Sequence, residues 1–450
     1  MNRIHRTRTA SLLALAGIGL IPAVVFGQTT KGVTQLSQLT LSQSGNAGIW
    51  GWVGSDGTEY ALPTTRSGTA IVSLKDPKAP KELFHLASPA GIWQELLTVG
   101  KYMYKCAEQG TGGMQIFDLS PLPAKPIELA SWTGVATCHS LWSDSLATPP
   151  RVYVEGSGDT KILSLADPAK PALVGTIKNA VHDGFARANT VFISNGGSKG
   201  VDIWNAASPA EPVRLGRIDL SVASTQLGEG TAGYSHNIWL TNDNKYAFTT
   251  EETNGKTLKV WDISDLAKPK FTGGKYLSGT GMAHNVYIRN NALYLSHYGQ
   301  GVRILDFSDP ANLKEVGFHN PGGSSWGCFP WLPSGLIIHG NGGLRVFDPD
   351  PAIKALGAGG SSSLAWGRPI SEFNIAGLEG NQVRFHLPKS GAYELSILDI
   401  SGKSLFNAKS KGDRGLQNLD LGARQLATGS YFVKLRQEAV QFSVPARVID

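Results

Sequence analysis

Residues 302–313, VRILDFSDPANL, contain the phrase that decides the fold: an apolar run, a small polar residue and a Pro-containing turn. The phrase returns in AIVSLKDPKAP (70–80), MQIFDLSPLPAKP (114–126), KILSLADPAKP (161–171), VDIWNAASPAEP (201–212), LKVWDISDLAKP (258–269) and LRVFDPDPA (344–352). The polar residues are Ser73, Asp118, Ser164, Asn205, Asp262, Asp306 and Asp348, at spacings of 45, 46, 41, 57, 44 and 42 residues. Short strands repeating about every 40 to 50 residues predict an all-β fold, a seven-bladed β-propeller with four strands in each blade.

The sixth repeat predicts the order of strands within a blade. AHNVYIR, NALYLSHY, GVRILDF and KEVGFHN each alternate or run apolar, and Gly, Asn or Pro separates them. The seventh repeat stops after its third strand, at LRVFD. We expect residues 33–42, which precede the first blade, to supply the missing outer strand and to close a propeller spanning residues 33–350.

The two ends of the chain differ from the repeats. Residues 1–27 combine Arg3, Arg6 and Arg8 with an apolar stretch, which predicts a signal peptide and a mature protein beginning near Gln28. Residues 351–368 are rich in Gly, Ser and Ala and predict a flexible linker. Residues 369–450 contain about six short strands separated by turn signals, which predicts a small β-sandwich.

Charge argues against nucleic-acid binding, and hydropathy argues against a membrane-spanning segment. Without the three arginines of the signal peptide, 38 basic residues face 35 acidic ones, and no basic run predicts nucleic-acid binding. The N-terminal apolar stretch is short for a membrane span, and no later segment is apolar enough, so we expect no transmembrane span in the mature chain.

Residues 35–350 resemble the LVIVD-type propellers known as the choice-of-anchor B family. The resemblance rests on IWGW and EYAL in the first repeat, GGMQIFDLS in the second, SHNIWLTNDNKYAF in the fifth, AHNVYIRNNALYLSHYGQGVRILD in the sixth and WGCFPWLPSG in the seventh. It implies an extracellular domain, secreted or held at the cell surface by differing C-terminal signals. It implies no established catalytic activity.

The C-terminal domain resembles the type A sorting domain of the bacterial type IX secretion system. The resembling phrases are FHLPKSGAYELSILDISGKSL and LATGSYFVKLRQ, whereas SVPARVID stands in place of the usual basic, apolar tail. The resemblance implies the type IX export machinery as a partner. The alternative is an accessory module that binds a polysaccharide or packs on the propeller.

Four repeats begin their first strand with histidine, in CHSLW, VHDGF, SHNIW and AHNVY. These residues are His139, His182, His236 and His284. In the other repeats the matching positions hold Trp50, Trp93 with Gln94, and Trp326. Because the first and second strands are antiparallel, residues at the end of the second strand should surround the same channel mouth. They are Glu108, Glu155, Asn195, Glu251, Glu252, His297 and His339.

Two interpretations of the histidines remain open. In the first, each histidine hydrogen-bonds a backbone carbonyl of the next blade and lies far from the others. In the second, they hold a divalent ion such as copper, zinc or iron, because imidazole and carboxylate are the usual donors for these metals. The sequence favours a non-catalytic binding module for an unknown extracellular ligand or protein. The alternative is a metal-dependent enzyme, an oxidase or a lyase, that uses the histidines.

The three cysteines, Cys106, Cys138 and Cys328, are too few for a fold built on disulfides. We expect three unpaired, buried thiols. If one bridge forms, Cys138 with Cys328 is the pair to test.

Overall fold

The structure is a computed structural model of the whole chain, and it describes most residues between 29 and 448. The described ranges are 29–45, 47–276, 280–289, 291–340, 342–357, 374–379, 382–387, 390–399, 404–412, 415–421, 426, 429–437 and 440–448. The predicted signal peptide (1–27) and residues 358–368 of the predicted linker lie outside these ranges.

The described residues up to Gly357 form seven antiparallel sheets. Each sheet takes its strands from one repeat in chain order, and the last two sheets each add one strand from the N-terminal segment. The first three are β3 (Ile49–Val53), β4 (Glu59–Thr65), β5 (Gly68–Ser73), β6 (Lys81–Ala87); β7 (Gln94–Val99), β8 (Tyr102–Ala107), β9 (Gln115–Asp118), β10 (Ile127–Glu128); and β11 (Leu141–Asp144), β12 (Arg151–Gly156), β13 (Asp159–Ser164), β14 (Ala172–Ile177). The next two are β15 (Asp183–Arg187), β16 (Thr190–Ser194), β17 (Gly200–Asn205), β18 (Val213–Asp219); and β19 (Ser235–Leu240), β20 (Tyr246–Glu251), β21 (Leu258–Asp262), β22 (Lys270–Tyr276). The last two contain β23 (Ala283–Arg289), β24 (Ala292–His297), β25 (Gly301–Asp306), β26 (Lys314–Asn320); and β27 (Cys328–Phe329), β28 (Ile337–Gly340), β29 (Leu344–Asp348).

The repeated polar residue explains why the chain turns after each third strand. Its side chain accepts a hydrogen bond from the backbone N–H two residues further on, which closes a turn before the fourth strand. The distances are 2.8 Å for Asp118, Asn205 and Asp306, 2.9 Å for Asp262 and Asp348, 3.2 Å for Ser164 and 3.3 Å for Ser73. The repeat that decides the fold is therefore a turn signal.

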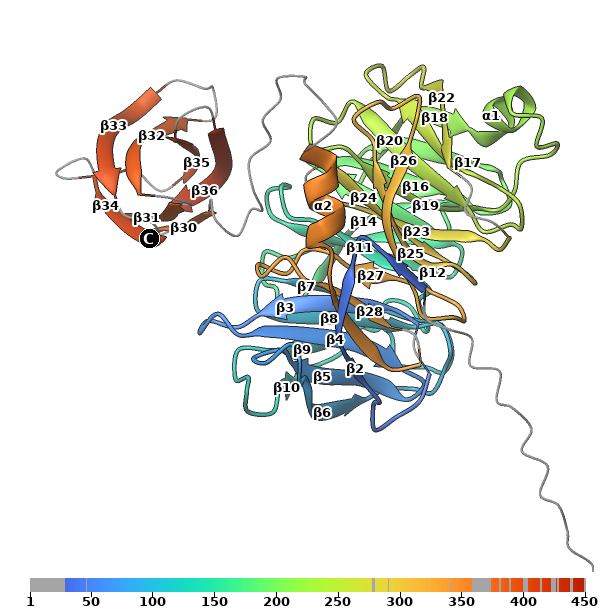
Figure 1. Cartoon of the computed structure of the whole chain (residues 1–450), viewed down its shortest axis with the longest axis horizontal. Helices are drawn as coiled ribbons and strands as arrows, with labels where there is room; N and C mark the ends of the chain where they lie inside the picture. The colour runs from blue at the N-terminus through green and yellow to red at the C-terminus, as the bar shows by residue number, and fades with distance from the viewer. Residues whose placement is uncertain are drawn as a thin grey trace, which may run out of the picture.

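The first strands of neighbouring sheets lie next to one another around a central channel, whose cavity they line. In Figure 1 the sheets run from the blue strands β3 to β6 at the bottom to the yellow-green strands β17, β18 and β22 at the top. Strand β3 contacts both β7 and β27, and the contacts continue from β7 through β11, β15 and β19 to β23. The apolar core lies between the sheets. The half-buried ring of Trp239, for example, packs against three different core clusters. This arrangement is a β-propeller.

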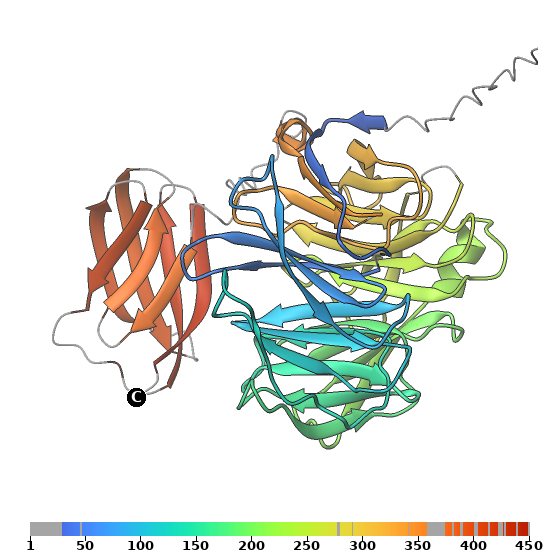
Figure 2. The ribbon, with the colours of Figure 1, turned by 90° about the horizontal axis from the view of Figure 1, so that it is seen from below.

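The N-terminal segment pairs with the end of the repeat region. Strand β2 (Thr34–Leu39) pairs antiparallel with β29, so that Thr34 faces Asp348 and Leu39 faces Leu344. Strand β1 (Thr29–Lys31) adds to the outer edge of β26. Figure 2 shows these blue strands beside the orange strands of the last two sheets.

Two helices accompany the sheets, and one corrects the predicted linker. Helix α1 (Leu220–Gln226) follows β18, and the Asp219 carboxylate caps its N-terminus by accepting from the Ser221 N–H at 2.9 Å. Helix α2 (Asp350–Gly357) occupies residues that we assigned to the linker. Its Ala352 is fully buried in the core cluster that also contains Tyr294 and Ile304. This burial makes the start of the predicted linker part of the propeller's packing.

The C-terminal region forms two further antiparallel sheets. One contains β30 (Asn374–Glu379), β31 (Gln382–Leu387) and β34 (Gly415–Asp420); the other contains β32 (Gly391–Asp399), β33 (Ser404–Gly412), β35 (Gly429–Gln437) and β36 (Val440–Val448). One apolar cluster draws Phe385 from the first sheet and Leu395 and Leu435 from the second. The segment with the unusual ending, SVPARVID, therefore contributes to an edge strand, β36.

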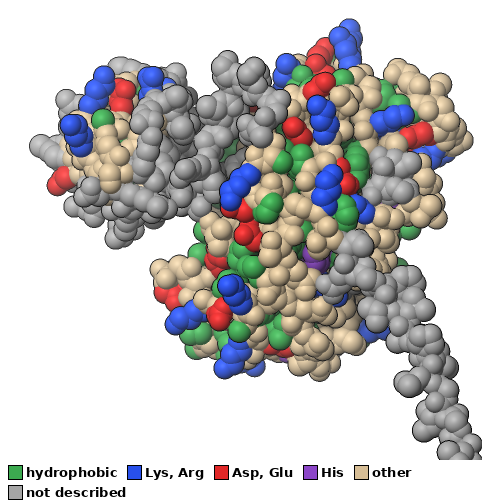
Figure 3. Space-filling view, viewed as in Figure 1, with side chains coloured by type: hydrophobic (Ala, Val, Ile, Leu, Met, Phe, Trp, Pro, Cys, Tyr) green, Lys and Arg blue, Asp and Glu red, His purple; other side chains and the backbone are tan. Residues whose placement is uncertain are grey.

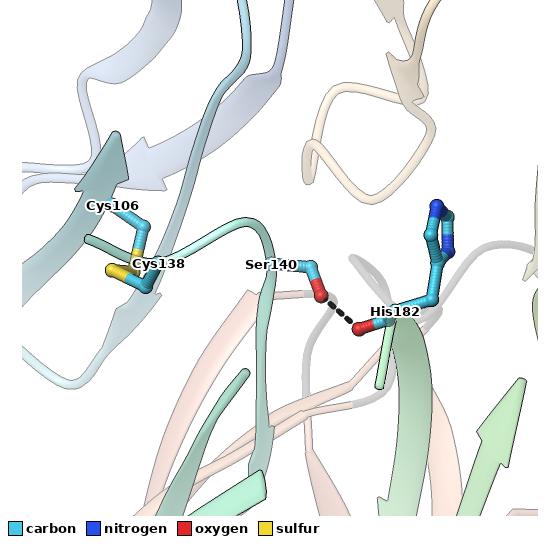
Figure 4. Close-up of a disulfide and its surroundings, with 4 residues drawn as sticks. All are labelled: Cys106, Cys138, Ser140 and His182. Atoms are coloured by element: carbon cyan, nitrogen blue, oxygen red, sulfur yellow. Dashed lines mark hydrogen bonds between the residues drawn. A yellow bond between two sulfur atoms is a disulfide. The ribbon is translucent and has the colours of Figure 1, made fainter. Parts of the chain in front are cut away.

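The cysteine prediction is wrong. Cys106, at the end of β8, forms a disulfide with Cys138, just before β11, and Cys328 is free and fully buried. The bridge joins two neighbouring sheets close to Ser140, whose hydroxyl donates to the backbone carbonyl of His182 (Figure 4). The end of β8 and the starts of β11 and β15, in three successive sheets, are thus connected near the predicted histidine positions.

The surface agrees with the sequence analysis on charge. On the face shown in Figure 3, the described Lys and Arg side chains are interspersed with Asp and Glu. In the described part of the chain, no helix is long and apolar enough to cross a membrane.

Candidate functional site

The four predicted histidines lie where inner strands begin, at one mouth of the channel. His139 lies two residues before β11 and His182 one residue before β15, whereas His236 and His284 are the second residues of β19 and β23. The pairing of β19 with β20 skips from Ser235 to Ile238, and β23 carries the matching irregularity. A β-bulge of this kind re-aims side chains, so consecutive His and Asn residues can both face the channel.

The four residues contact one another in sequence, and we call them the histidine cluster. Ring centroids are 4.7 Å apart for His139 and His182, 4.5 Å for His182 and His236, and 3.9 Å for His236 and His284. The Trp326 ring continues the row at 4.9 Å from His284. The purely structural interpretation requires histidines that lie far from one another. The contacts between these rings contradict that requirement.

Backbone hydrogen bonds account for part of the arrangement. Nδ1 of His182 lies 3.2 Å from the carbonyl oxygen of His236, and Nδ1 of His284 lies 2.7 Å from that of Trp326. Each bond reaches the neighbouring sheet, as the structural interpretation predicts. However, Nδ1 of His236 and Nε2 of His284 are buried without a hydrogen-bond partner. The His284 backbone also acts on the pKa of His236, so backbone hydrogen bonding leaves Nε2 of His284 as the unexplained nitrogen.

Glu252 brings a carboxylate to the buried side of the cluster. Its oxygens lie 3.7 Å from Nε2 of His236 and 3.9 Å from Nε2 of His284. One ligand atom each from His182, His236 and Glu252 lie within 4.8 Å of one another. Two imidazoles and a carboxylate form a donor set that suits zinc, iron or copper.

Glu108 and Glu155 lie beside the exposed end of the cluster. The Glu108 carboxylate is 3.1 Å from Nδ1 of His139, and the two cysteines of the disulfide lie two residues before Glu108 and one residue before His139. Glu155 is buried in β12, where burial raises the pKa of its carboxyl to about 6 while His139 opposes that rise. This end of the mouth is more polar and more open to solvent than the end at His284.

Burial keeps the inner histidines neutral. It lowers the pKa of His182 and of His284 to about 3 and that of His236 well below its usual value, and the neighbouring histidines lower the pKa of His236 further. Burial also raises the pKa of Glu252, while a hydrogen bond from Tyr298 opposes the rise. Neutral imidazole is the form that binds metal ions.

Several predicted mouth residues have other contacts. Glu251 is fully buried and forms an ion pair with the equally buried Lys259. Asn195 donates to Asp202 at 3.0 Å, and Nδ1 of His297 lies 2.9 Å from the Tyr298 carbonyl oxygen. His339 is fully buried in β28, with its ring centroid 6.2 Å from that of His319. The structure does not place these four residues among the contacts of the histidine cluster.

The residues at the matching positions of the other sheets also differ in where they lie, some near the mouth and some away from it. Gln94 is fully buried, and its amide donates to the carbonyls of Arg66 and Gly91 at 3.1 and 3.0 Å. Trp93 accepts a backbone hydrogen bond from Glu108 at 3.1 Å, which places it near the mouth. Trp50 packs against Phe329 and Trp331, deeper in the channel.

The sequence analysis missed a polar layer of the channel wall. Glu95, Asp183, Asn237 and Asn285 line a cavity of about 620 Å³ together with aromatic side chains of the inner strands. Burial raises the pKa of Glu95 to about 8 and that of Asp183 to about 6. The dipeptide His-Asn, repeated at 236–237 and 284–285, was the one available signal for this layer.

The fold and the channel define a repeat β-propeller, a class that contains both binding modules and enzymes. A family model described as LVIVD repeat matches residues 280–320, which include β23 to β26. Among solved structures, the chain is similar to one titled "Structure of U3-55K", with a TM-score of 0.50 and 12% identity over 70% of this chain and 98% of that chain. At this identity the similarity concerns the fold alone. A search of curated proteins gave no match.

Proposed function

We propose that this protein is an exported binding module whose ligand docks on a divalent metal ion held by His182, His236 and Glu252. The LVIVD match and the propeller fold are typical of a protein-interaction module. The observation that supports the metal ion is the approach of three donor atoms to within 4.8 Å of one another at the channel mouth. The cluster supplies neutral imidazoles and a nearby carboxylate, which is what such an ion requires.

The geometry needs only a small adjustment to accept an ion. Donors on one tetrahedral zinc ion stand about 3.3 Å apart, because each bond is about 2.0 to 2.1 Å long. The three donor atoms lie within 4.8 Å of one another, so the side chains must move closer together, and Glu252, which is 28% exposed, has room to move. The ligand would complete the coordination from the open side, where Glu108 and His139 can contact it.

Loss of one donor tests this proposal. We expect the full chain to bind one Zn²⁺ and His236→Ala to bind it at least about 100-fold more weakly, because even the loss of a residue that only supports a ligand costs about 10- to 100-fold. Isothermal titration calorimetry measures both affinities. His85→Gln is the matched control, since His85 lies on β6, the outer strand of another sheet, and contacts the Thr65 hydroxyl there. Equal affinities for the wild type and His236→Ala would reject the site.

The donor set also favours the enzyme as a second candidate. Three protein donors leave a coordination position open, which is the pattern of catalytic zinc sites. In a metal-dependent oxidase or lyase the bound ligand would be converted, whereas a binding module returns its ligand unchanged. Analysis of the ligand recovered after incubation with the metal-loaded protein separates the two.

We further propose that the seven sheets are the blades of one closed propeller spanning residues 33–350, and that the C-terminal sheets form a β-sandwich that directs export through the type IX machinery. The pairing of β2 with β29 supports the closure. The Cys106–Cys138 disulfide supports export, because disulfides persist in oxidising compartments.

Truncation tests the role of the C-terminal region. Removing residues 369–450 should leave a folded propeller inside the cell envelope rather than at the cell surface, because the propeller has its own core clusters. Surface labelling and cell fractionation measure the distribution, and the melting temperature reports folding. A truncated protein that still reaches the surface would favour the accessory-module interpretation.

A further inference from the structure

The central cavity has one aromatic region and one acidic region, both built from inner strands. Its aromatic wall includes the rings of Trp50, Trp239 and Trp331. The Trp331 centroid lies 5.0 Å from that of Trp239, with the rings stacked, and 5.6 Å from that of Trp50. A volume of about 620 Å³ is in the range of small-molecule sites.

Two carboxylates at the acidic region accept hydrogen bonds from neutral donors. The Glu95 carboxylate accepts from the Trp326 indole N–H at 2.8 Å. The Asp183 carboxylate accepts from the Asn237 amide at 2.5 Å and from the Gly184 N–H at 2.7 Å. Among the described residues, no Lys or Arg forms an ion pair with either carboxylate. These two carboxyl groups therefore have no cationic partner among the described residues.

The one cation on the cavity wall is engaged elsewhere. Arg187, at the far end of β15, donates to the Thr241 carbonyl at 2.8 Å and to the Asn244 side chain at 2.7 Å. Its guanidinium also covers the Phe185 ring, 4.8 Å from the centroid. Arg187 is thus held at the opposite end of the strand from Asp183.

Two buried polar atoms of the wall also lack partners. Asn285 is 6% exposed and Trp142 is also 6% exposed, and both line the cavity. Neither the amide oxygen of Asn285 nor the indole nitrogen of Trp142 has a hydrogen-bond partner. The Asn285 oxygen can accept from a ligand group that supplies an N–H, whereas the Trp142 indole can donate to a ligand acceptor.

We propose that this cavity binds a small organic cation, an ammonium or guanidinium group on an apolar body, with the charge at Glu95 and Asp183 and the body against Trp50, Trp239 and Trp331. The N–H donors of such a cation suit the two carboxylates and the Asn285 oxygen. Aromatic faces attract cations and accept apolar groups, but they supply no ligands to a bare metal ion. The inference does not depend on the metal ion at the histidine cluster.

The raised pKa of Glu95 agrees with this assignment. Burial is its main cause and the charge of Asp183 adds to it. A bound cation would relieve the repulsion between the two carboxyl groups. The positions of the two carboxyl groups and the aromatic rings support the cation site independently of this pKa shift.

The test compares a cation with a neutral molecule of the same shape on the full-length protein. Phenethylammonium and 2-phenylethanol are titrated separately at neutral pH with EDTA present, and calorimetry or quenching of tryptophan fluorescence measures binding. We expect the ammonium compound to bind at least about tenfold more tightly, because hydrogen bonds to charged groups are worth more than neutral ones. EDTA removes any contribution from a metal ion at the histidine cluster.

A matched pair of variants locates the site. Glu95→Gln keeps the acceptor for Trp326 and should weaken phenethylammonium binding at least about tenfold while leaving 2-phenylethanol unaffected. Glu211→Gln, an exposed residue in the turn after β17, should change neither affinity. Equal affinities for the two probes in the wild type, no binding of phenethylammonium at about 10 mM, or full affinity in folded Glu95→Gln would each overturn the proposal.

Discussion

Deleting residues 33–42 is expected to destabilise the whole propeller by about 5 kcal/mol or more, a large part of the stability of a typical domain. The deletion removes β2 and exposes the pairing edge of β29. It also removes four apolar side chains that pack in the core clusters, Val33, Leu36, Leu39 and Leu41. In addition, fully buried His319 loses its 2.7 Å contact with the Gln35 side chain. Thermal or urea unfolding of the purified protein measures the change.

Two controls separate the loss of β2 from the effect of shortening the chain. Replacing Leu36, Leu39 and Leu41 by Ser keeps the chain length and should still destabilise by several kcal/mol. Removing residues 369–450 takes away far more of the chain, yet it should leave the propeller's unfolding transition in place. An unchanged melting temperature after deletion of 33–42 would show that the closure is wrong.

The second large effect concerns the disulfide. Replacing Cys106 and Cys138 by Ser should lower the free energy of unfolding by about 3 to 4 kcal/mol, because the bridge closes a loop with a sequence separation of 32. The same change should loosen the contact between Glu108 and His139, since both lie beside the bridge. Denaturant unfolding with and without dithiothreitol measures the loss.

Dithiothreitol supplies the internal control. It should destabilise the wild type and Cys328→Ala, in which the bridge remains, but should leave the double Ser variant unchanged. A wild type that is insensitive to reduction under denaturing conditions would mean that the bridge contributes little to stability. A cytosolic location of the native protein would contradict the export proposal separately, because glutathione keeps thiols there reduced.

The repeat predicted the propeller because one local device recurs in every sheet. The polar residue after the third strand closes a turn through its own side chain, as Asp306 does with the Ser308 N–H. Such a local signal is visible in sequence. Strand β36 escaped prediction because Pro445 argues against a strand, although an edge strand tolerates proline.

The error over the cysteines has a geometric cause. The end of a second strand and the start of the next inner strand meet at one mouth of the channel, which is the argument that placed Glu108 near His139. The same argument applies to Cys106 and Cys138, which stand two and one residues before them. The prediction of three unpaired thiols came from the number of cysteines alone and did not use the repeat register.

The candidate site was only partly accessible from sequence. The repeat register identified the four histidines, and the structure brings them into contact. Adjacent residues face opposite sides, so Glu251 and Glu252 diverge. The repeat register could not show which of them turns to Lys259 and which to the histidines. Glu95 and Asp183 were missed because the residue types at these two positions do not repeat between sheets.

Anomalous diffraction from crystals of the full chain soaked in Zn²⁺ tests the metal site most directly. We expect one strong zinc peak per chain. It should lie about 2.0 to 2.1 Å from a ring nitrogen of His182 and of His236 and about 2.0 to 2.2 Å from a Glu252 oxygen. A zinc peak at Glu108 and His139 alone, or no peak at the histidine cluster, would contradict the proposed metal site.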